Sequence, residues 1–337
     1  MKTVFVTIPW FIPAFKAGGP IVSIANMVNE LTDEYEFYIY TSNEDLHGFP
    51  IAVAVTNQWT TYNSYTKVWY AAKKDRSQNL VEQVKLLRPD SLFIVGVFDW
   101  HFNIVPMLYA ECNDKIVSVR GMLHPGALQQ KAIKKKIFLQ AMKWIGLDKK
   151  CSFHATDAAE ARYIKNILSA DVRVHVAANF PRLFPKQELP VKTQGTLKLI
   201  SIGIISPMKN YQLVLEALLR VRATVQYDIY GPIKEVVYWE RCLETIKSLP
   251  ANISVAYHPE LPAHKVCNKL KGRHVFILPS KSENYGHAIV EALSAGLPVI
   301  TSRCVPWVGL EECRAGINVE MEGKRETVSS LKLGIYG

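Results

Sequence analysis

Two glutamates, Glu283 and Glu291, stand eight residues apart on either side of a predicted helix start. The helix is expected over residues 287–295, after a break at Gly286 and before a stop at Gly296. The first carboxylate then precedes the helix, and the second lies a little over one turn inside it. Because the unpaired amides at a helix start favour anions, carboxylates around them suit a ligand that carries both phosphate and hydroxyl groups. A nucleotide sugar is such a ligand.

The spacing of these glutamates has a plainer explanation as well. A loop, a helix and a strand with a glutamate at each end is a common arrangement. One carboxylate could cap the helix while the other lies on a solvated face. The spacing alone therefore favours no binding site, and the residues around the two glutamates have to decide between the interpretations.

The sequence from residue 283 to residue 299 resembles the donor-binding signature of the retaining GT-B glycosyltransferases of family 4, the glycosyl transferases of group 1. That signature joins a glutamate, an aromatic residue, a glycine and a second glutamate to a helix of small residues and a proline-containing strand start. The residues that match it are Glu283, Tyr285, Gly286, Glu291, Gly296, Pro298 and Val299. Agreement at so many fixed offsets is not expected from chance.

The resemblance implies a hexosyltransferase that moves a sugar from a nucleotide-diphosphate donor to an acceptor hydroxyl, with retention of configuration. It implies no metal and no cofactor, since the nucleotide sugar is a co-substrate, and the chain contains no DxD pair of carboxylates. Glu283 would contact the donor sugar and Glu291 the ribose hydroxyls, and Asn284, Tyr285 and Gly286 would belong to the donor site. The acceptor would be a glycan, a lipid-linked sugar or a small molecule, in polysaccharide or glycoconjugate synthesis.

A pair of glycines, Gly18 and Gly19, follows the first predicted strand and precedes an apolar-periodic helix that Pro20 would open. Paired glycines let a backbone approach a phosphate closely, although a simple tight turn has the same composition. Their position agrees with the glycine loop of the family. The resemblance therefore assigns Gly18 and Gly19 to donor binding.

Lys209 precedes a predicted helix in a segment that resembles the diphosphate-binding stretch of the family. Lysine can neutralise phosphate oxygens as a point charge, although most loop lysines are merely exposed. The family has an arginine five residues earlier, where this chain has Ile204. An apolar residue cannot offset phosphate charge. The sequence therefore leaves open a catalytically reduced protein that binds nucleotide sugars, unless another cation compensates.

His124 lies in a loop that runs from Arg120 to Pro125. In relatives with a similar sequence this loop borders the donor sugar, and many relatives carry a histidine that bonds to it. The resemblance therefore makes His124 a catalytic candidate beside Glu283 and Lys209, although a single histidine is more often structural.

Apolar runs alternate with helical periodicity along the whole chain, which predicts α/β domains with parallel sheets. In the first half we expect strands at residues 3–7, 37–41, 67–71, 91–95, 116–119, 152–155 and 172–176, and helices at 20–31, 77–87, 103–111, 127–145 and 158–168. In the second half we expect strands at 197–202, 225–230, 253–256, 275–279 and 298–301, and helices at 210–222, 235–249, 263–270 and 287–295.

A proline-rich segment separates the two halves. We expect an N-terminal acceptor-side Rossmann-like domain over residues 1–178, a linker over 179–196, and a C-terminal donor-nucleotide-binding domain over 197–337. Two doubly wound domains with an interdomain cleft constitute the GT-B fold that the resemblance implies. The resemblance ends near Val319, where relatives continue through a further helix pair, so we expect a short C-terminus.

The net charge of +10 raises nucleic acid and anionic membranes as partners. The basic excess is spread over both halves, and no aromatic-basic stripe is present, so we expect no nucleic-acid binding. One cluster stands out between Lys131 and Lys150, where lysines alternate with apolar residues. This stretch fits either a domain helix with a solvated lysine face or a peripheral membrane contact.

The apolar start of the chain contains Pro9 and Pro13 and is too short to span a bilayer. It reads as a strand rather than a signal peptide. The six cysteines show neither a CxxC pair nor ligand spacing with histidines. We therefore expect reduced thiols in a cytoplasmic protein, with any membrane contact on the inner face.

Overall fold

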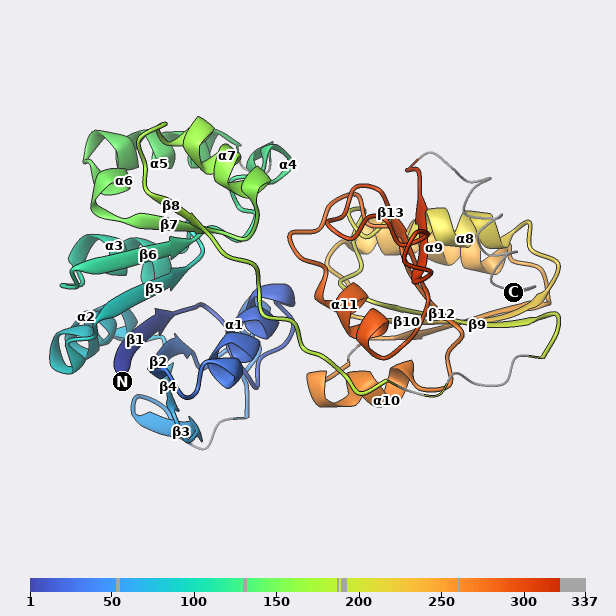
Figure 1. The fold of residues 1–337 in the computed structure, drawn as a ribbon, viewed down its shortest axis with the longest axis horizontal. Coiled ribbons are helices and arrows are strands. Elements are labelled where there is room, and N and C mark those ends of the chain that lie inside the picture. The colour runs from blue at the N-terminus through green and yellow to red at the C-terminus, as the bar shows by residue number, and fades with distance from the viewer. Residues whose placement is uncertain (53–54, 130–131, 187, 189–192, 260, 322–337) are drawn as a thin grey trace. The chain divides into compact units, whose positions relative to one another are not determined.

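The chain folds into two compact units, Met1–Phe180 and Pro181–Gly337. The computed structural model describes residues 1–52, 55–129, 132–186, 188, 193–259 and 261–321 (Figure 1). The division falls inside the proline-rich segment 179–196, of which residues 187 and 189–192 lie outside the described part. Each unit has its own sheet and helices.

The N-terminal unit contains an eight-stranded sheet with the order β3-β4-β2-β1-β5-β6-β7-β8. All pairs are parallel except β3 with β4. The strands are β1 (Lys2–Thr7), β2 (Tyr35–Ser42), β3 (Trp59–Asn63), β4 (Thr66–Ala71), β5 (Ser91–Val95), β6 (Asp114–Ser118), β7 (Ser152–Ala155) and β8 (Val174–Val176). Of the strands in this unit only β3 was missed, since it pairs with β4 as a local hairpin rather than through a crossover.

The helices of this unit differ from the predicted ones mainly where the structure has two helices in place of one predicted helix. They are α1 (Gly19–Glu30), α2 (Arg76–Leu87), α3 (Val105–Tyr109), α4 (Pro125–Gln129), α5 (Ala132–Trp144), α6 (Leu147–Lys150) and α7 (Ala158–Ile167), with short turns η1 (Leu46–Gly48) and η2 (Trp100–Ile104). The prediction of an α-helix at 103–111 is wrong at its first residues. They belong to η2, which has π-helical bonding and is capped by the side chain of Asp99.

The C-terminal unit contains a six-stranded, fully parallel sheet with the order β11-β10-β9-β12-β13-β14. Its strands are β9 (Thr196–Ile202), β10 (Thr224–Tyr230), β11 (Ile253–His258), β12 (Val275–Leu278), β13 (Val299–Ser302) and β14 (Gly316–Val319). Its helices are α8 (Tyr211–Leu218), α9 (Val236–Lys247), α10 (Val266–Leu270) and α11 (His287–Ser294), with the turn η3 (Ala263–Lys265) before α10. The helix predicted at 210–222 ends four residues earlier, at Leu218, and β14 was not predicted.

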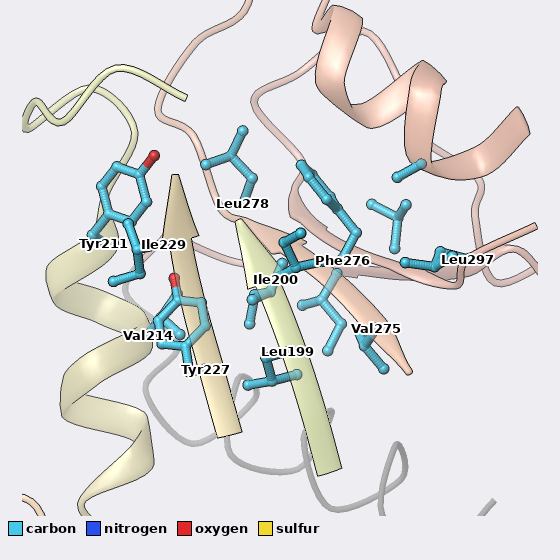
Figure 2. Close-up of a cluster of buried hydrophobic side chains, with 14 of the residues drawn as sticks. Leu199, Ile200, Tyr211, Val214, Tyr227, Ile229, Val275, Phe276, Leu278 and Leu297 are labelled. Carbon is cyan, nitrogen blue, oxygen red and sulfur yellow. The ribbon is translucent and has the colours of Figure 1, made fainter. Parts of the chain in front are cut away.

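A parallel sheet covered by helices must be apolar on both faces, and the core of this unit has that composition. Figure 2 shows Leu199 and Ile200 of β9 beside Tyr227 of β10 and Phe276 of β12, all within one buried cluster. Burying a side chain of this size stabilises the fold by about 1.5–3 kcal/mol. The core therefore fixes β9 beside β12, which determines where the loops after these strands emerge.

The neighbouring strands β9 and β12 form the point at which the strand order of the C-terminal sheet reverses. Ligands of doubly wound sheets bind outside the carboxyl ends of the strands at such a point. In the N-terminal sheet the corresponding neighbours are β1 and β5. The loops after these four strands are therefore where a ligand site is expected in each unit.

Gly231, directly after β10, allows the backbones of two loops to touch. Its φ is +143°, and a Cβ there would lie 2.1 Å from the carbonyl oxygen of Gly203. The amide of Gly203 donates to the carbonyl of Tyr230 (2.9 Å), and that of Ile205 donates to Pro232 (2.9 Å). A side chain at position 231 would separate the loops, so glycine is required there.

Among the described residues, no helix is both long and apolar enough to span a bilayer. The six cysteines are all described and form no disulfide.

Candidate functional site

An ion pair joins the two loops at the reversal point of the C-terminal sheet. Lys209, in the loop after β9, contacts the carboxylate of Glu283, in the loop after β12. The side chains are only 21% and 10% exposed. The Ser280 hydroxyl donates to Glu283 Oε1 (2.6 Å), and the amide of Lys281 donates to the carbonyl of Met208 (2.7 Å). Two predicted site residues, 74 positions apart in sequence, are thus brought together.

The pairing changes how the lysine has to be understood. A half-buried ammonium in contact with a carboxylate is already charge-compensated, and a charge-assisted hydrogen bond contributes roughly 1.5–3 kcal/mol. Lys209 is therefore not an isolated cation, and Glu283 is held by both Lys209 and Ser280. An anion that recruits Lys209 must share it with Glu283 or displace that carboxylate.

Glu291 is the fifth residue of α11 and is 6% exposed. No described residue donates a hydrogen bond to its carboxylate. Burial raises the pKa of Glu291 to about 7, and the positive charge of Arg182 opposes the rise. Arg182 is itself held by a bond to the carbonyl of Ala263 (2.9 Å) and by the Phe184 ring, 4.8 Å away. Sequence reasoning missed Arg182, because the segment was read only as a linker.

The loop between Glu283 and α11 ends at Gly286, whose φ of +78° belongs to the left-handed region. A Cβ there would lie 3.2 Å from Ile289 and 3.4 Å from Trp307. The ring of Tyr285 meets that of Trp307 edge to face, with centroids 5.6 Å apart. The indole N–H of Trp307 donates to the carbonyl of Tyr285. Trp307 thus packs against the loop that contains Asn284, Tyr285 and Gly286.

Trp307 is in turn held by Asn318, a buried residue of β14. The Asn318 amide donates to the carbonyls of Trp307 (2.9 Å) and Ser302 (3.3 Å). Its Oδ1 accepts from the amide of Leu310 (3.2 Å). Neither Trp307 nor Asn318 was predicted to serve the site. Trp307 could have been noticed only as a large aromatic residue in a loop after a strand.

Ile204 is half-buried in the loop between β9 and Lys209. Backbone bonds of Gly203 and Ile205 fix the chain on either side of it. An apolar residue thus occupies the position at which the resemblance leads us to expect a cation. Lys281, in the loop after β12, is exposed, and the hydrogen bond from its amide to Met208 keeps its backbone beside the Lys209 loop. It is therefore a candidate for a compensating charge.

The glycine turn of the N-terminal unit, at the reversal point between β1 and β5, is held by Asp45. Gly18 has φ +73° and ψ −128°, a conformation open essentially to glycine, and α1 begins at Gly19. The buried carboxylate of Asp45 accepts from the amides of Phe15 (3.0 Å) and Lys16 (3.2 Å). Sequence reasoning missed Asp45, which follows a different strand.

His124 lies just before α4 in the same unit. Its Nδ1 accepts from the amide of Gly126 (3.1 Å), and its ring meets Tyr163 edge to face with centroids 5.1 Å apart. A neutral ring with Nδ1 as acceptor carries its proton on Nε2. The same loop is fixed by the buried Glu160, which accepts from the Gly121 amide. His124 is therefore set up to donate through Nε2.

Within the part of the chain that the structure describes, no group of three or more histidine, cysteine, aspartate or glutamate residues is placed to hold a metal ion. The predicted site residues are thus distributed over the units as follows. Gly18, Gly19 and His124 belong to the N-terminal unit, and Lys209, Glu283, Asn284, Tyr285, Gly286 and Glu291 belong to the C-terminal unit.

The two doubly wound units form the GT-B fold of glycosyltransferases. Residues 186–309 match the family model described as glycosyl transferases group 1. The resemblance expected from the sequence is therefore confirmed, and so is the predicted fold class. A search of curated proteins found no match.

Solved structures of similar fold include several glycosyltransferases. Sucrose-phosphate synthase from Thermosynechococcus elongatus has a TM-score of 0.70 at 12% identity, over 99% of this chain and 89% of its own. HepE from Anabaena, solved with UDP-glucose, has a TM-score of 0.66 at 13% identity, and the match covers 99% of this chain and 90% of HepE. WaaG, a glycosyltransferase involved in lipopolysaccharide biosynthesis, has a TM-score of 0.64 at 12% identity. The match covers 99% of this chain and 90% of WaaG.

The buried carboxyl of Glu291 predicts a pH-dependent stability. Its pKa is raised from 4.5 to about 7 in the folded chain. Its contribution to stability is therefore complete below about pH 4.5 and is lost as the pH rises through 7, on the order of 3 kcal/mol in total. Glu291→Gln should match the wild type near pH 4.5 and exceed its melting temperature by several degrees at pH 8.

The Arg182→Gln variant is the complementary control. Without this cation the carboxyl is harder to ionise, so stability should fall further between pH 6 and 8 than in the wild type. Melting curves of the Glu291→Gln variant that run parallel to the wild type across this range would contradict the assignment.

The indole of Trp307 predicts a local effect on the Tyr285 loop. Trp307→Phe keeps an aromatic ring but loses the bond to the Tyr285 carbonyl, which is worth about 1 kcal/mol. Amide hydrogen exchange of residues 283–288 should become several-fold faster while the sheet is unchanged. Trp239→Phe, in the same unit but on α9, is the control and should leave this segment as it is. Equal exchange rates of residues 283–288 in both variants would show that Trp307 does not stabilise this loop.

Proposed function

We propose that the protein is a retaining hexosyltransferase that uses a nucleotide-diphosphate sugar as donor and an acceptor hydroxyl as nucleophile. The observation that carries the proposal is the Lys209–Glu283 ion pair at the reversal point of the C-terminal sheet. Its residues belong to a segment that matches glycosyl transferases group 1. HepE, a protein of similar fold, was solved with UDP-glucose, which supports a nucleoside diphosphate sugar as donor.

In the proposed reaction the bond between the anomeric carbon and the diphosphate oxygen breaks, and the diphosphate leaves with the electron pair. The acceptor oxygen forms the new bond on the same face, and its proton passes to the departing diphosphate. Lys209 and the amides near Gly18 and Gly286 would stabilise the charge on the leaving group. Glu283 and His124 would hold the donor sugar as positive charge develops on it.

The remaining assignments concern binding of the donor. Glu291 would accept from the ribose hydroxyls, and Gly19, Asn284 and Tyr285 would complete the donor site. The burial of the Glu291 carboxylate supports its assignment, because hydroxyl donors would compensate the burial that raises its pKa.

The proposal includes no metal and no resident cofactor, because lysine and backbone amides are assigned to the diphosphate charge. We further propose that the acceptor is a glycan, a lipid-linked sugar or a small molecule, and that the reaction serves polysaccharide or glycoconjugate synthesis in the cytoplasm. WaaG, of similar fold, is involved in lipopolysaccharide biosynthesis, which supports this setting. A peripheral contact with the inner face of a membrane is part of the proposal.

Ile204 favours a second candidate function, a catalytically reduced protein that binds nucleotide sugars. Isothermal titration with UDP- and GDP-sugars, followed by a turnover assay with the donor that binds, separates the two. Binding without hydrolysis or transfer supports the second function.

Glu283→Gln tests the catalytic assignment. The change keeps the size of the side chain and its ability to accept from Ser280, but removes the charge that faces Lys209. Turnover of the donor should fall by roughly 10²–10³-fold, with a shift in melting temperature of only about a few degrees. Glu244→Gln, an exposed change on α9, is the control and should alter neither. Wild-type turnover in Glu283→Gln would show that catalysis does not need this charge. A variant that fails to fold would show that the carboxylate is structural.

Ile204→Arg tests the missing charge. An added guanidinium beside the diphosphate should strengthen UDP binding by on the order of 1–3 kcal/mol, measured by titration calorimetry. Ile204→Leu is the control for a changed side chain without charge. If Lys281 compensates in the natural protein, Lys281→Gln should weaken UDP binding, and Ile204→Arg should restore it. No gain in either background would mean that the site does not need this charge.

A further inference from the structure

The outward face of α5 is apolar at its centre. Ile133, Ile137 and Trp144 are 77%, 64% and 90% exposed. At 100° per residue, these three positions fall within an arc of about 40° on the helix surface. The exposed face of this helix therefore contains large apolar side chains as well as the lysines that its composition predicts.

The opposite face of α5 already anchors the helix to its domain. Leu139 and Met142 are buried in the core of the N-terminal unit. Phe138 meets Phe98 edge to face with centroids 5.6 Å apart, and the ammonium of Lys135 bonds to the carbonyl of Ala127 (2.6 Å). The exposed isoleucines and tryptophan are thus not needed to fix the helix. Lys131, which begins the lysine-rich stretch, lies outside the described residues.

Positive charge borders the apolar centre. Lys134 and Lys136 are exposed and lie on either side of it, about 100° and 60° from Ile133. Lys149 and Lys150 are exposed on α6, just beyond the end of α5. Between residues 132 and 150 the single acidic residue is Asp148, and it is buried. The face thus combines exposed apolar side chains with exposed lysines.

A basic hollow of about 950 Å³ adjoins the end of this face. Ile145, directly after Trp144, lines it together with Lys85, Arg88, Lys115 and Lys150. Glu111 is the one carboxylate among its lining residues. The elements that form it, α2, α3 and α6, lie at the same end of the N-terminal sheet (Figure 1). The hollow extends the positive charge past the apolar centre.

We propose that the face formed by Ile133, Ile137 and Trp144 with its flanking lysines, here called the α5 face, docks on a membrane rich in anionic phospholipid. Apolar side chains that enter the headgroup boundary, bordered by lysines that meet phosphate, are the composition that such a surface binds. A second copy is a poorer occupant, because two α5 faces would oppose their lysines. The inference rests on the proposed function only in identifying the membrane at which the transfer would take place.

The test is co-sedimentation of the full-length chain with vesicles of phosphatidylcholine, with and without 30% phosphatidylglycerol. The wild type should bind the anionic vesicles and bind phosphatidylcholine at least tenfold more weakly. Ile133→Ser with Ile137→Ser and Trp144→Ser should lose binding. Lys134→Gln with Lys136→Gln should weaken it roughly tenfold or more, since each lysine near an anionic surface contributes a factor of about five.

The matched control is Val236→Ser with Val237→Ser on α9, two valines that are also largely exposed, and it should bind like the wild type. Acyl chains brominated near the headgroup should quench the fluorescence of the wild type more than that of Trp144→Phe. Arg88→Gln with Lys150→Gln should also weaken binding to anionic vesicles.

The proposal is overturned if the wild type does not bind anionic vesicles, or if the serine variant binds them as well as the wild type does. A wild type that is dimeric by analytical ultracentrifugation, with the dimer lost in the serine variant, would assign the face to a second copy instead. Donor binding, measured by calorimetry on the same preparations, is expected to be equal in all variants. Its failure would concern the proposed function and not the α5 face.

Discussion

The candidate site of the C-terminal unit depends on one constraint, the contact between Lys209 and Glu283. Neither residue belongs to regular structure. They meet because the sheet core, apolar on both faces, fixes β9 beside β12, and because a backbone bond from Lys281 to Met208 ties the two loops together. The charge arrangement is therefore a result of strand order. A change in the core that shifted β12 against β9 would act on the site without touching it.

Much of the fold could be predicted, because strands buried on both faces give continuous apolar runs and helices give a period of 3.6 residues. What failed were features with a different physical origin. The β3 strand belongs to a local hairpin whose mixed composition resembles a loop. The η2 turn is set by a side-chain cap from Asp99. For α5, periodicity shows which residues share a face. It does not show which face the sheet covers, because both faces of that helix contain large apolar residues.

The candidate site was predictable where a motif is contiguous, and not where support comes from distant parts of the chain. Glu283, Gly286 and Glu291 share one short segment. Trp307 donates a hydrogen bond to that segment from a later loop, and the charge of Arg182 acts on Glu291 from the stretch before β9. No local pattern indicates such interactions. Asp45 has the same relation to the glycine turn of the other unit. Sequence reasoning proposes residues that would face a ligand, and it missed the residues that pack against or bond to their loops.

The contact between Lys209 and Glu283 has a consequence for the last step of the proposed reaction. A cation that already has an intramolecular anion resists every free anion that enters, including the spent nucleotide. In the proposed reaction, the carboxylate of Glu283 would pair again with the ammonium of Lys209 after sugar transfer and so favour release of the nucleoside diphosphate. Under that proposal Glu283 would compete with the product for Lys209, and product inhibition would be weaker than with an unpaired lysine.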